Sequence, residues 1–194
     1  SLQNLMNEGA IFAARRAAEV ITAADIDSAI DRIIVGLEKK GAVQTENTKR
    51  TVAYHEAGHA LLGALVPDYD LVQKVTIIPR SNGAGGLTFF SPSEERLGSG
   101  LYSREYLECQ LAVALGGRLA EELVFGEKKV TTGASSDIQN VARIARSMVT
   151  EWGMSSLVGP VAMMTDGGMM SQGPSYAAET LLNIDNEVLR LVNN

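Results

Sequence analysis

The sequence predicts a mainly α-helical protein with one small β-hairpin, an α+β fold. Several long segments place apolar side chains every three or four positions, which is the spacing of one face of an α-helix. Residues 71–78 alternate instead and are rich in β-branched side chains, as in a strand. A hydrophobic content of 45% over 194 residues is enough to build a core.

The first forty residues predict two helices. The second is introduced by Thr22-Ala-Ala-Asp25, a capping box in which the two end side chains satisfy backbone N–H groups of the first turn. It should extend to Leu37. Apolar positions with helical spacing define the first helix: Leu2, Leu5, Met6, Gly9, Phe12 and Ala13.

A third helix and a hairpin follow. The helix should span residues 48–65, because Pro67 cannot continue it. Residues 71–78 and 87–90 read as two strands, and the glycine-rich residues 79–86 between them have the composition of a turn. We therefore expect a β-hairpin directly after this helix.

The C-terminal half predicts further helices. The polar residues 91–103 lead into a long helix over residues 103–125, with Gly126 as its cap. Gly116 and Gly117 lie inside it, where each glycine costs about 1 kcal/mol relative to alanine, so we expect close backbone packing there. A helix over residues 137–152 should end at Gly153, and residues 160–174 should connect it to a last helix that begins near residue 175.

Composition excludes several classes of protein. A net charge of −6, without any basic block, argues against nucleic acid as a partner. Cys109 is the one cysteine of the sequence and cannot form an internal disulfide. No segment has the roughly 18 consecutive apolar residues of a membrane span.

Both histidines of the chain, His55 and His59, lie four residues apart on the predicted helix of residues 48–65. Residues with this spacing share a helix face, so the two imidazoles can bind one metal ion. Glu56 lies beside His55, within reach of a water on that metal. This HExxH pattern is typical of zinc proteases, in which zinc lowers the pKa of its water to about 7 and the glutamate takes the proton.

The third ligand is not fixed by spacing. No third histidine exists, so the ligand must be a carboxylate or Cys109. The Glu121–Glu122 pair would follow enzymes that use two histidines and a glutamate. Asp137, at the start of a predicted helix, is the other candidate.

Five motifs together give the sequence a family resemblance. They are HEAGHA at 55–60, VTIIPR at 75–80, GGLTFF at 85–90, GGRLAEEL at 116–123 and TTGASSDI at 131–138. From about residue 48 onward the chain resembles the peptidase domain of FtsH, a membrane-anchored, ATP-dependent zinc metalloprotease. Residues 1–40 resemble the last helices of the AAA+ ATPase module of that family.

The resemblance implies roles for particular residues. Asp137 becomes the third zinc ligand beside His55 and His59, with one zinc per subunit, and Glu56 becomes the catalytic base. Glu121 would orient a ligand histidine. A strand formed by Leu87, Thr88, Phe89 and Phe90 would pair with the backbone of the substrate.

The resemblance also sets the expected context. Residues 1–40 would be the end of an ATPase module and residues 41–194 a peptidase domain without its C-terminal helices. The sequence has no G-x-x-x-x-G-K-[ST] loop, so ATP and Mg²⁺ would bind in a part of the ATPase module outside this chain. Substrates would be unfolded or damaged membrane and soluble proteins.

The assembly would be a homo- or hetero-hexamer attached to a membrane through N-terminal segments. Residues 91–108 look most like chloroplast and cyanobacterial members, which implies a thylakoid or cyanobacterial membrane. The alternative hypothesis is a proteolytically inactive subunit that serves only the structure of the ring. A complete His-Glu-His pattern argues against it, since assembly does not require a base beside a metal.

Overall fold

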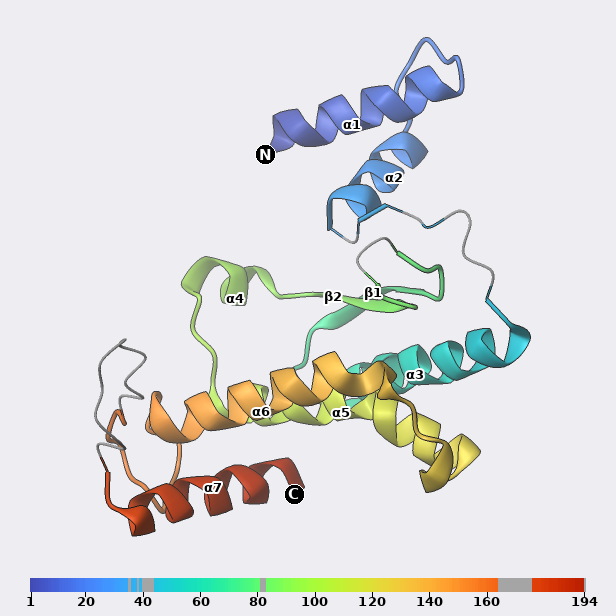
Figure 1. Cartoon of the computed structure of the whole chain (residues 1–194). Helices are drawn as coiled ribbons and strands as arrows, with labels where there is room; N and C mark the ends of the chain where they lie inside the picture. Colours follow the sequence, from blue (N-terminus) through green and yellow to red (C-terminus); the bar gives the residue numbers. More distant parts are fainter. Residues whose placement is uncertain (35, 38, 40–43, 81–82, 164–175, 194) are drawn as a thin grey trace, which may run out of the picture. The chain divides into compact units, whose positions relative to one another are not determined.

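The computed structural model describes residues 1–34, 36–37, 39, 44–80, 83–163 and 176–193 (Figure 1). It is mostly helical, with a two-stranded antiparallel sheet, and this confirms the predicted α+β class. The elements are α1 Leu2–Arg15, α2 Ala23–Ile34, α3 Glu46–Leu65, β1 Leu71–Thr76, β2 Leu87–Ser91, α4 Glu94–Ser99, α5 Arg104–Phe125, the 3₁₀ turns η1 Glu127–Lys129 and η2 Thr132–Ala134, α6 Ser135–Thr150 and α7 Ala178–Asn193.

The chain forms two compact units. The first contains Ser1–Ala53 and Thr76–Leu87, and the second contains Tyr54–Val75 and Thr88–Asn194. The first unit includes the beginning of α3 and the connection between the strands.

In the first unit, α1 packs on α2. Gly9 allows the approach, since a β-carbon at this position would lie 2.8 Å from Ile26 Cδ1. Half of the predicted capping box is present: the Asp25 carboxylate accepts a hydrogen bond from the Thr22 backbone N–H at 2.7 Å. The Thr22 hydroxyl donates to Asp25 Oδ2 at 2.7 Å instead of accepting from the Asp25 N–H, which donates to the Thr22 carbonyl. Asp25 also accepts from Arg16 Nε at 2.9 Å. The helix α2 ends at Ile34, however, and Leu37 lies beyond it.

The connection between the strands packs within the same first unit. Arg80 is buried, donates to the Gly36 carbonyl at 3.4 Å and lies 3.7 Å from the Asp31 carboxylate. The Lys39 backbone N–H donates to the Pro79 carbonyl at 2.9 Å. The strand β1 ends at Thr76 rather than at residue 78, where the chain turns toward these contacts.

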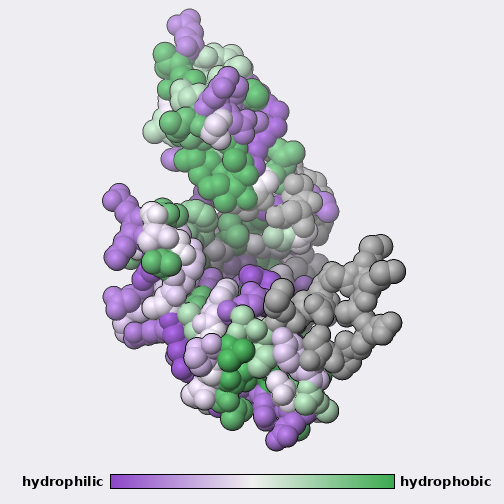
Figure 2. All heavy atoms as spheres, turned by 90° about the vertical axis from the view of Figure 1, so that its left-hand side faces the viewer, coloured by the Kyte–Doolittle hydropathy of each residue, from purple (hydrophilic) through white to green (hydrophobic). Residues whose placement is uncertain are grey.

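Apolar side chains of α1 and α2 also reach the surface, and they colour the upper part of Figure 2 green. On the described residues of these two helices they include Leu2, Met6, Ile30, Ile33 and Ile34. The first unit therefore buries only part of the apolar surface of its helices.

The hydrophobic core of the second unit lies between α5, α6 and α7. Met148 and Val149 of α6 are completely buried, so α6 is the central helix of this core. The other buried members of the cluster are Tyr106, Leu107, Leu111, Val141, Ile144, Ala145, Ile184 and Leu191.

The expected close packing at the glycine pair of α5 is present. A β-carbon on Gly58 of α3 would lie 2.2 Å from the Gly116 carbonyl oxygen, and one on Gly116 would lie 2.8 Å from the Gly58 carbonyl oxygen. The two helices therefore touch backbone to backbone. The glycines offset their helix cost by allowing this contact.

The polar residues 91–103 contain a short helix, α4, that the periodicity did not predict. Ser93 caps its first turn and Gly100 ends it with φ 63°. Arg96 holds it in place: it pairs with buried Asp70 at 2.7 Å, donates to the Asp68 carbonyl and stacks 4.4 Å from the Tyr106 ring centroid. Six residues are too few to reveal a helical period.

The ends of α5 and the start of α7 lie close to the positions predicted from the sequence. Ser103 and Gly126 cap α5 as expected, and α7 begins at Ala178. Residues 164–174 of the predicted connection lie outside the described residues. Among the helices that the structure describes, none has both the length and the apolar character of a membrane span.

We predict that Gly58→Ala lowers the free energy of unfolding by about 1–3 kcal/mol, because the new methyl group forces α3 and α5 apart. Thermal or denaturant unfolding in the presence of a chelator measures this effect without any contribution from bound metal. Gly98→Ala is the matched control: it lies in α4 with nothing within 4 Å of the added carbon. Equal stability of the two variants would contradict the close-packing interpretation.

Candidate metal centre

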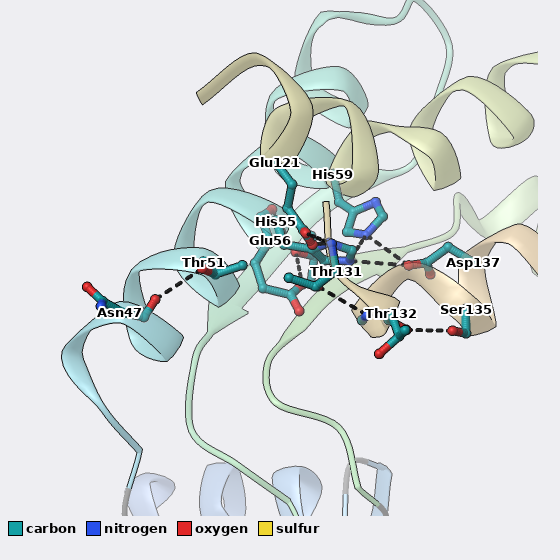
Figure 3. A network of polar contacts seen from close by, with 12 residues as sticks. Asn47, Thr51, His55, Glu56, His59, Glu121, Thr131, Thr132, Ser135 and Asp137 are labelled. Atoms are coloured by element: carbon teal, nitrogen blue, oxygen red, sulfur yellow. Dashed lines mark hydrogen bonds and ion pairs between the residues drawn. The ribbon is translucent and has the colours of Figure 1, made fainter. Parts of the chain in front are cut away.

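The two histidines lie on the buried face of α3, opposite α5 (Figure 3). Each side chain is part of the interior of the second unit, with a relative exposure of 9% for both residues. The ring centroids are 4.7 Å apart with the planes nearly perpendicular. The spacing of four residues therefore places the imidazoles side by side, as predicted.

Hydrogen bonds set the orientation of both rings. His59 Nδ1 lies 2.8 Å from the Val113 carbonyl oxygen, which can only accept, so this nitrogen carries the proton. His55 Nδ1 donates to Glu121 Oε1 at 2.8 Å. In the neutral rings the lone pairs are then on the two Nε2 atoms, the atoms that a metal would bind.

Asp137 completes a group of three converging donors. The two Nε2 atoms are 3.1 Å apart, and Asp137 Oδ2 lies 3.2 Å from His55 Nε2 and 3.7 Å from His59 Nε2. Ligands about 2.0–2.1 Å from a tetrahedral zinc ion are separated by about 3.3 Å. The three donors therefore fit one ion of this size and geometry, and they form a group of the described residues that could hold a metal.

The structure distinguishes between the carboxylates that spacing left open. Glu121 is only 1% exposed and uses its oxygens elsewhere: Oε1 accepts from His55 and Oε2 accepts from the Thr131 backbone N–H at 2.8 Å. Glu122 pairs with Arg118 at 2.7 Å near the surface. Neither glutamate, nor Cys109, belongs to the group formed by His55, His59 and Asp137.

The loop before α6 delivers Asp137. The Thr131 side chain caps the turn η2 by accepting from the Gly133 N–H at 3.2 Å. The helix α6 then starts at Ser135, two residues earlier than predicted, with Asp137 in its first turn. Because Glu121 holds both His55 and the Thr131 amide, one buried carboxylate aligns ligands from two distant segments.

Gly117 leaves room for the rings. A β-carbon at this position would lie 2.5 Å from His59 Nε2 and 2.6 Å from His55 Nε2. The second glycine of the pair in α5 therefore faces the candidate ligands themselves. Any other residue here would displace the imidazoles.

Glu56 lies beside the three donors and is buried, with 7% relative exposure. Its Oε2 accepts a hydrogen bond from the Thr88 hydroxyl at 2.8 Å. Burial raises the pKa of Glu56, and the Thr88 hydrogen bond and the nearby histidines only partly oppose this. A carboxyl group whose pKa is raised toward neutrality suits both acceptance and return of a proton.

Charges in the group are strongly coupled. Burial by itself would raise the pKa of Asp137, but the imidazoles of His55 at 3.2 Å and His59 at 3.7 Å, when protonated, lower it to about 2. Burial likewise disfavours protonated His55, yet its hydrogen bonds to Asp137 and Glu121 raise the pKa of this imidazole overall. The ionised aspartate and the two imidazoles thus attract positive charge to the point between them.

The predicted substrate strand coincides with β2, Leu87–Ser91. Within the second unit, Thr88 reaches Glu56, and Phe90 packs where a β-carbon on Gly63 of α3 would lie 2.3 Å from its ring. Thr88 and Phe90 therefore face α3, and Phe89 points to the other side of the strand. In the part of the chain that the structure describes, β2 pairs with β1 alone.

The sequence did not predict three interactions that shape the candidate site. The Val113 carbonyl and the Thr131 amide belong to the backbone, so no side-chain pattern reports them. Thr88 was predicted as part of the substrate strand, without its contact to Glu56. The Gly116–Gly117 pair of α5 predicted close helix packing, but not the space that Gly117 leaves for the two imidazoles.

The chain is similar to known proteins. Residues 42–194 match the profile of Peptidase family M41. The chain belongs to peptidase family M41. This confirms the predicted resemblance, since its M41 relatives include "ATP-dependent zinc metalloprotease FtsH 3" of Synechocystis, 58% identical over 99% of this chain.

Other M41 relatives come from plants and cyanobacteria. "ATP-dependent zinc metalloprotease FTSH 5, chloroplastic" of Arabidopsis thaliana is 58% identical over 98% of the chain. "ATP-dependent zinc metalloprotease FtsH" of Synechococcus is 52% identical over 99%. The chain spans 32%, 28% and 31% of the lengths of these three proteins, in the order given.

We predict that Gly117→Ala lowers zinc affinity by roughly 10–100-fold, the effect typical of disturbing the support of a ligand. The methyl group turns the imidazoles away from their common point without removing any ligand. Competition with a chromophoric chelator measures the affinity, and Gly98→Ala serves as the control in open space. Unchanged affinity would show that Gly117 has no part in shaping the site.

Proposed function

We propose that the chain is the zinc endopeptidase part of an ATP-dependent protease, with His55, His59 and Asp137 as the zinc ligands. The convergence of three electron-pair donors at tetrahedral spacing carries this proposal. The M41 match supports it, as do relatives named as ATP-dependent zinc metalloproteases. The donor set of two imidazoles and a carboxylate suits zinc and leaves a fourth position for water or substrate.

Glu56 acts as the general base and later as the general acid. Bound zinc supplies Lewis acidity, which lowers the pKa of a water and polarises a peptide carbonyl. Glu56 takes the proton from the attacking water and returns it to the leaving amine. Its burial beside the ligands keeps the carboxyl group at the reacting atoms. Glu121 holds His55 in the tautomer that binds metal.

Leu87, Thr88, Phe89 and Phe90 would bind the substrate through the backbone of β2. An added strand on the edge of this strand would run past Glu56, because Thr88 and Glu56 are in contact. Main-chain pairing reads little sequence, which fits unfolded polypeptides as substrates.

A peptide N-methylated near the cleaved bond should lose kcat/KM, whereas side-chain changes of similar size should not. Equal tolerance of both changes would oppose strand addition.

The wider context is also part of the proposal. Residues 1–40 would end an AAA+ ATPase module, and their exposed apolar side chains fit helices that pack against a larger body. Residues 41–194 would be the peptidase domain. ATP and Mg²⁺ would bind elsewhere in a homo- or hetero-hexamer held at a membrane. Some relatives are named "chloroplastic", and others come from cyanobacteria. Both observations support a thylakoid or cyanobacterial membrane.

The alternative is a subunit of the ring that has lost proteolysis. The geometry favours the active enzyme, since a ring-building role does not require Gly117, Glu121 and Val113 to arrange two imidazoles around one point. Casein degradation by the full-length assembly, with and without chelator, separates the two. Chelator-sensitive cleavage supports the enzyme, and its absence in an ATP-hydrolysing assembly supports the structural subunit.

We predict that Glu56→Gln reduces kcat of the full-length protein by about 10²–10⁴-fold, because the amide cannot accept the proton. Zinc content should remain one per chain, since Glu56 is not a ligand. Peptide hydrolysis and elemental analysis of the same sample test both parts. Undiminished hydrolysis would remove Glu56 as the base.

We predict that Asp137→Asn weakens zinc binding by more than the roughly 10–100-fold expected for the loss of a supporting partner. Glu122→Gln is the matched control, because it removes the charge of the carboxylate paired with Arg118 outside the group. Zinc affinity by chelator competition measures both variants. Normal affinity of Asp137→Asn would exclude this aspartate as the third ligand.

A further inference from the structure

The hydroxyl of Thr88 lies next to two oxygens of Glu56. It is 2.8 Å from the carboxylate Oε2 and 3.0 Å from the backbone carbonyl oxygen of the same residue. A threonine hydroxyl has one proton, so it donates fully to only one of these acceptors at a time. The Thr88 hydroxyl of β2 thus makes one hydrogen bond to Glu56 of α3, which can point to either of the two oxygens.

We propose that Thr88 is the positioning residue of the catalytic base: its hydroxyl fixes Glu56 Oε2 and leaves Oε1 to exchange the proton. This rests on the proposed function of Glu56. The described part of the chain gives Oε2 a donor in Thr88 and none to Oε1. An oxygen that already accepts a strong hydrogen bond is the weaker base, so the proton of the water goes to Oε1.

The second contact gives the hydroxyl a resting place when Glu56 changes charge. While Glu56 is ionised, the proton of Thr88 points to Oε2. Once Oε1 is protonated, Oε2 is a weaker acceptor, and rotation about the Cβ–Oγ1 bond turns the same proton to the carbonyl of Glu56. Both acceptors are within 3.0 Å, so the exchange requires no movement of heavy atoms.

The rest of Thr88 suits this role. Its side chain faces α3, on the same side of β2 as Phe90, and so points away from the other face of the strand. Thr88 therefore acts on the reaction through Glu56, and its backbone remains available for pairing with substrate.

The test compares Thr88→Val with Thr88→Ser in the full-length protein, using hydrolysis of a fluorogenic peptide. Thr88→Val keeps the branched shape and removes the hydroxyl; we expect kcat to fall about 10–100-fold, with KM and zinc content unchanged. Thr88→Ser keeps the hydroxyl and should restore kcat to within about 3-fold of the original. Thr51→Val is the matched control, since the Thr51 hydroxyl donates to the Asn47 carbonyl at 3.0 Å on the exposed part of α3, away from Glu56.

Three outcomes would overturn the proposal: full kcat in Thr88→Val, equal loss in the Val and Ser variants, or a change confined to KM. Adding Thr88→Val to Glu56→Gln should cause no further loss, because Thr88 acts through the carboxylate that Glu56→Gln removes. An active Glu56→Gln variant would contradict the proposed function itself. An inactive Glu56→Gln beside a fully active Thr88→Val would contradict only the role of Thr88.

Discussion

The backbone contact between α3 and α5 is the constraint on which the whole site depends. Without side chains at Gly58 and Gly116, the two helices approach until the Val113 carbonyl reaches His59 at 2.8 Å. A helical carbonyl has a second lone pair, so Val113 can accept this bond without giving up its place in α5. A separation of even one ångström would break the bond and free the ring to rotate. Packing in this protein therefore determines a histidine tautomer.

Glu121 links His55 to the loop that precedes α6. Its two oxygens accept hydrogen bonds from His55 of α3 and from the Thr131 amide before α6. These partners lie 66 and 10 residues from Glu121 along the chain. A completely buried carboxylate with only one of these partners would be left with a costly unsatisfied oxygen. The two bonds thus support each other. The position of Asp137, six residues after Thr131, depends on the same carboxylate as the orientation of His55.

Local patterns were sufficient for much of this architecture. The His55–His59 spacing, the Asp25 side of the capping box and the ends of α5 could be predicted directly, because each is decided within a few residues. The third member of the candidate donor group, Asp137, could not, because it lies 82 residues from His55. Spacing left the Glu121–Glu122 pair and Asp137 about equal until the family resemblance favoured Asp137. Backbone partners such as the Val113 carbonyl leave no trace in side-chain chemistry. The helix α4 depends on a long-range contact of Arg96 with Asp70, which no local period reports.

Charge explains why the geometry and the chemistry agree. The buried carboxyl groups of Glu56 and Glu121 lie close to the half-buried carboxylate of Asp137 and to two imidazoles whose Nε2 atoms are 3.1 Å apart. Like charges and facing lone pairs repel strongly at low dielectric, so the arrangement favours a divalent cation at its centre. The packing at the glycines fixes the donors, and both oxygens of the Glu121 carboxylate accept hydrogen bonds, from His55 and from the Thr131 amide. Glu56 is then the buried carboxyl group beside these donors that, among the described residues, keeps one oxygen without a hydrogen-bond donor.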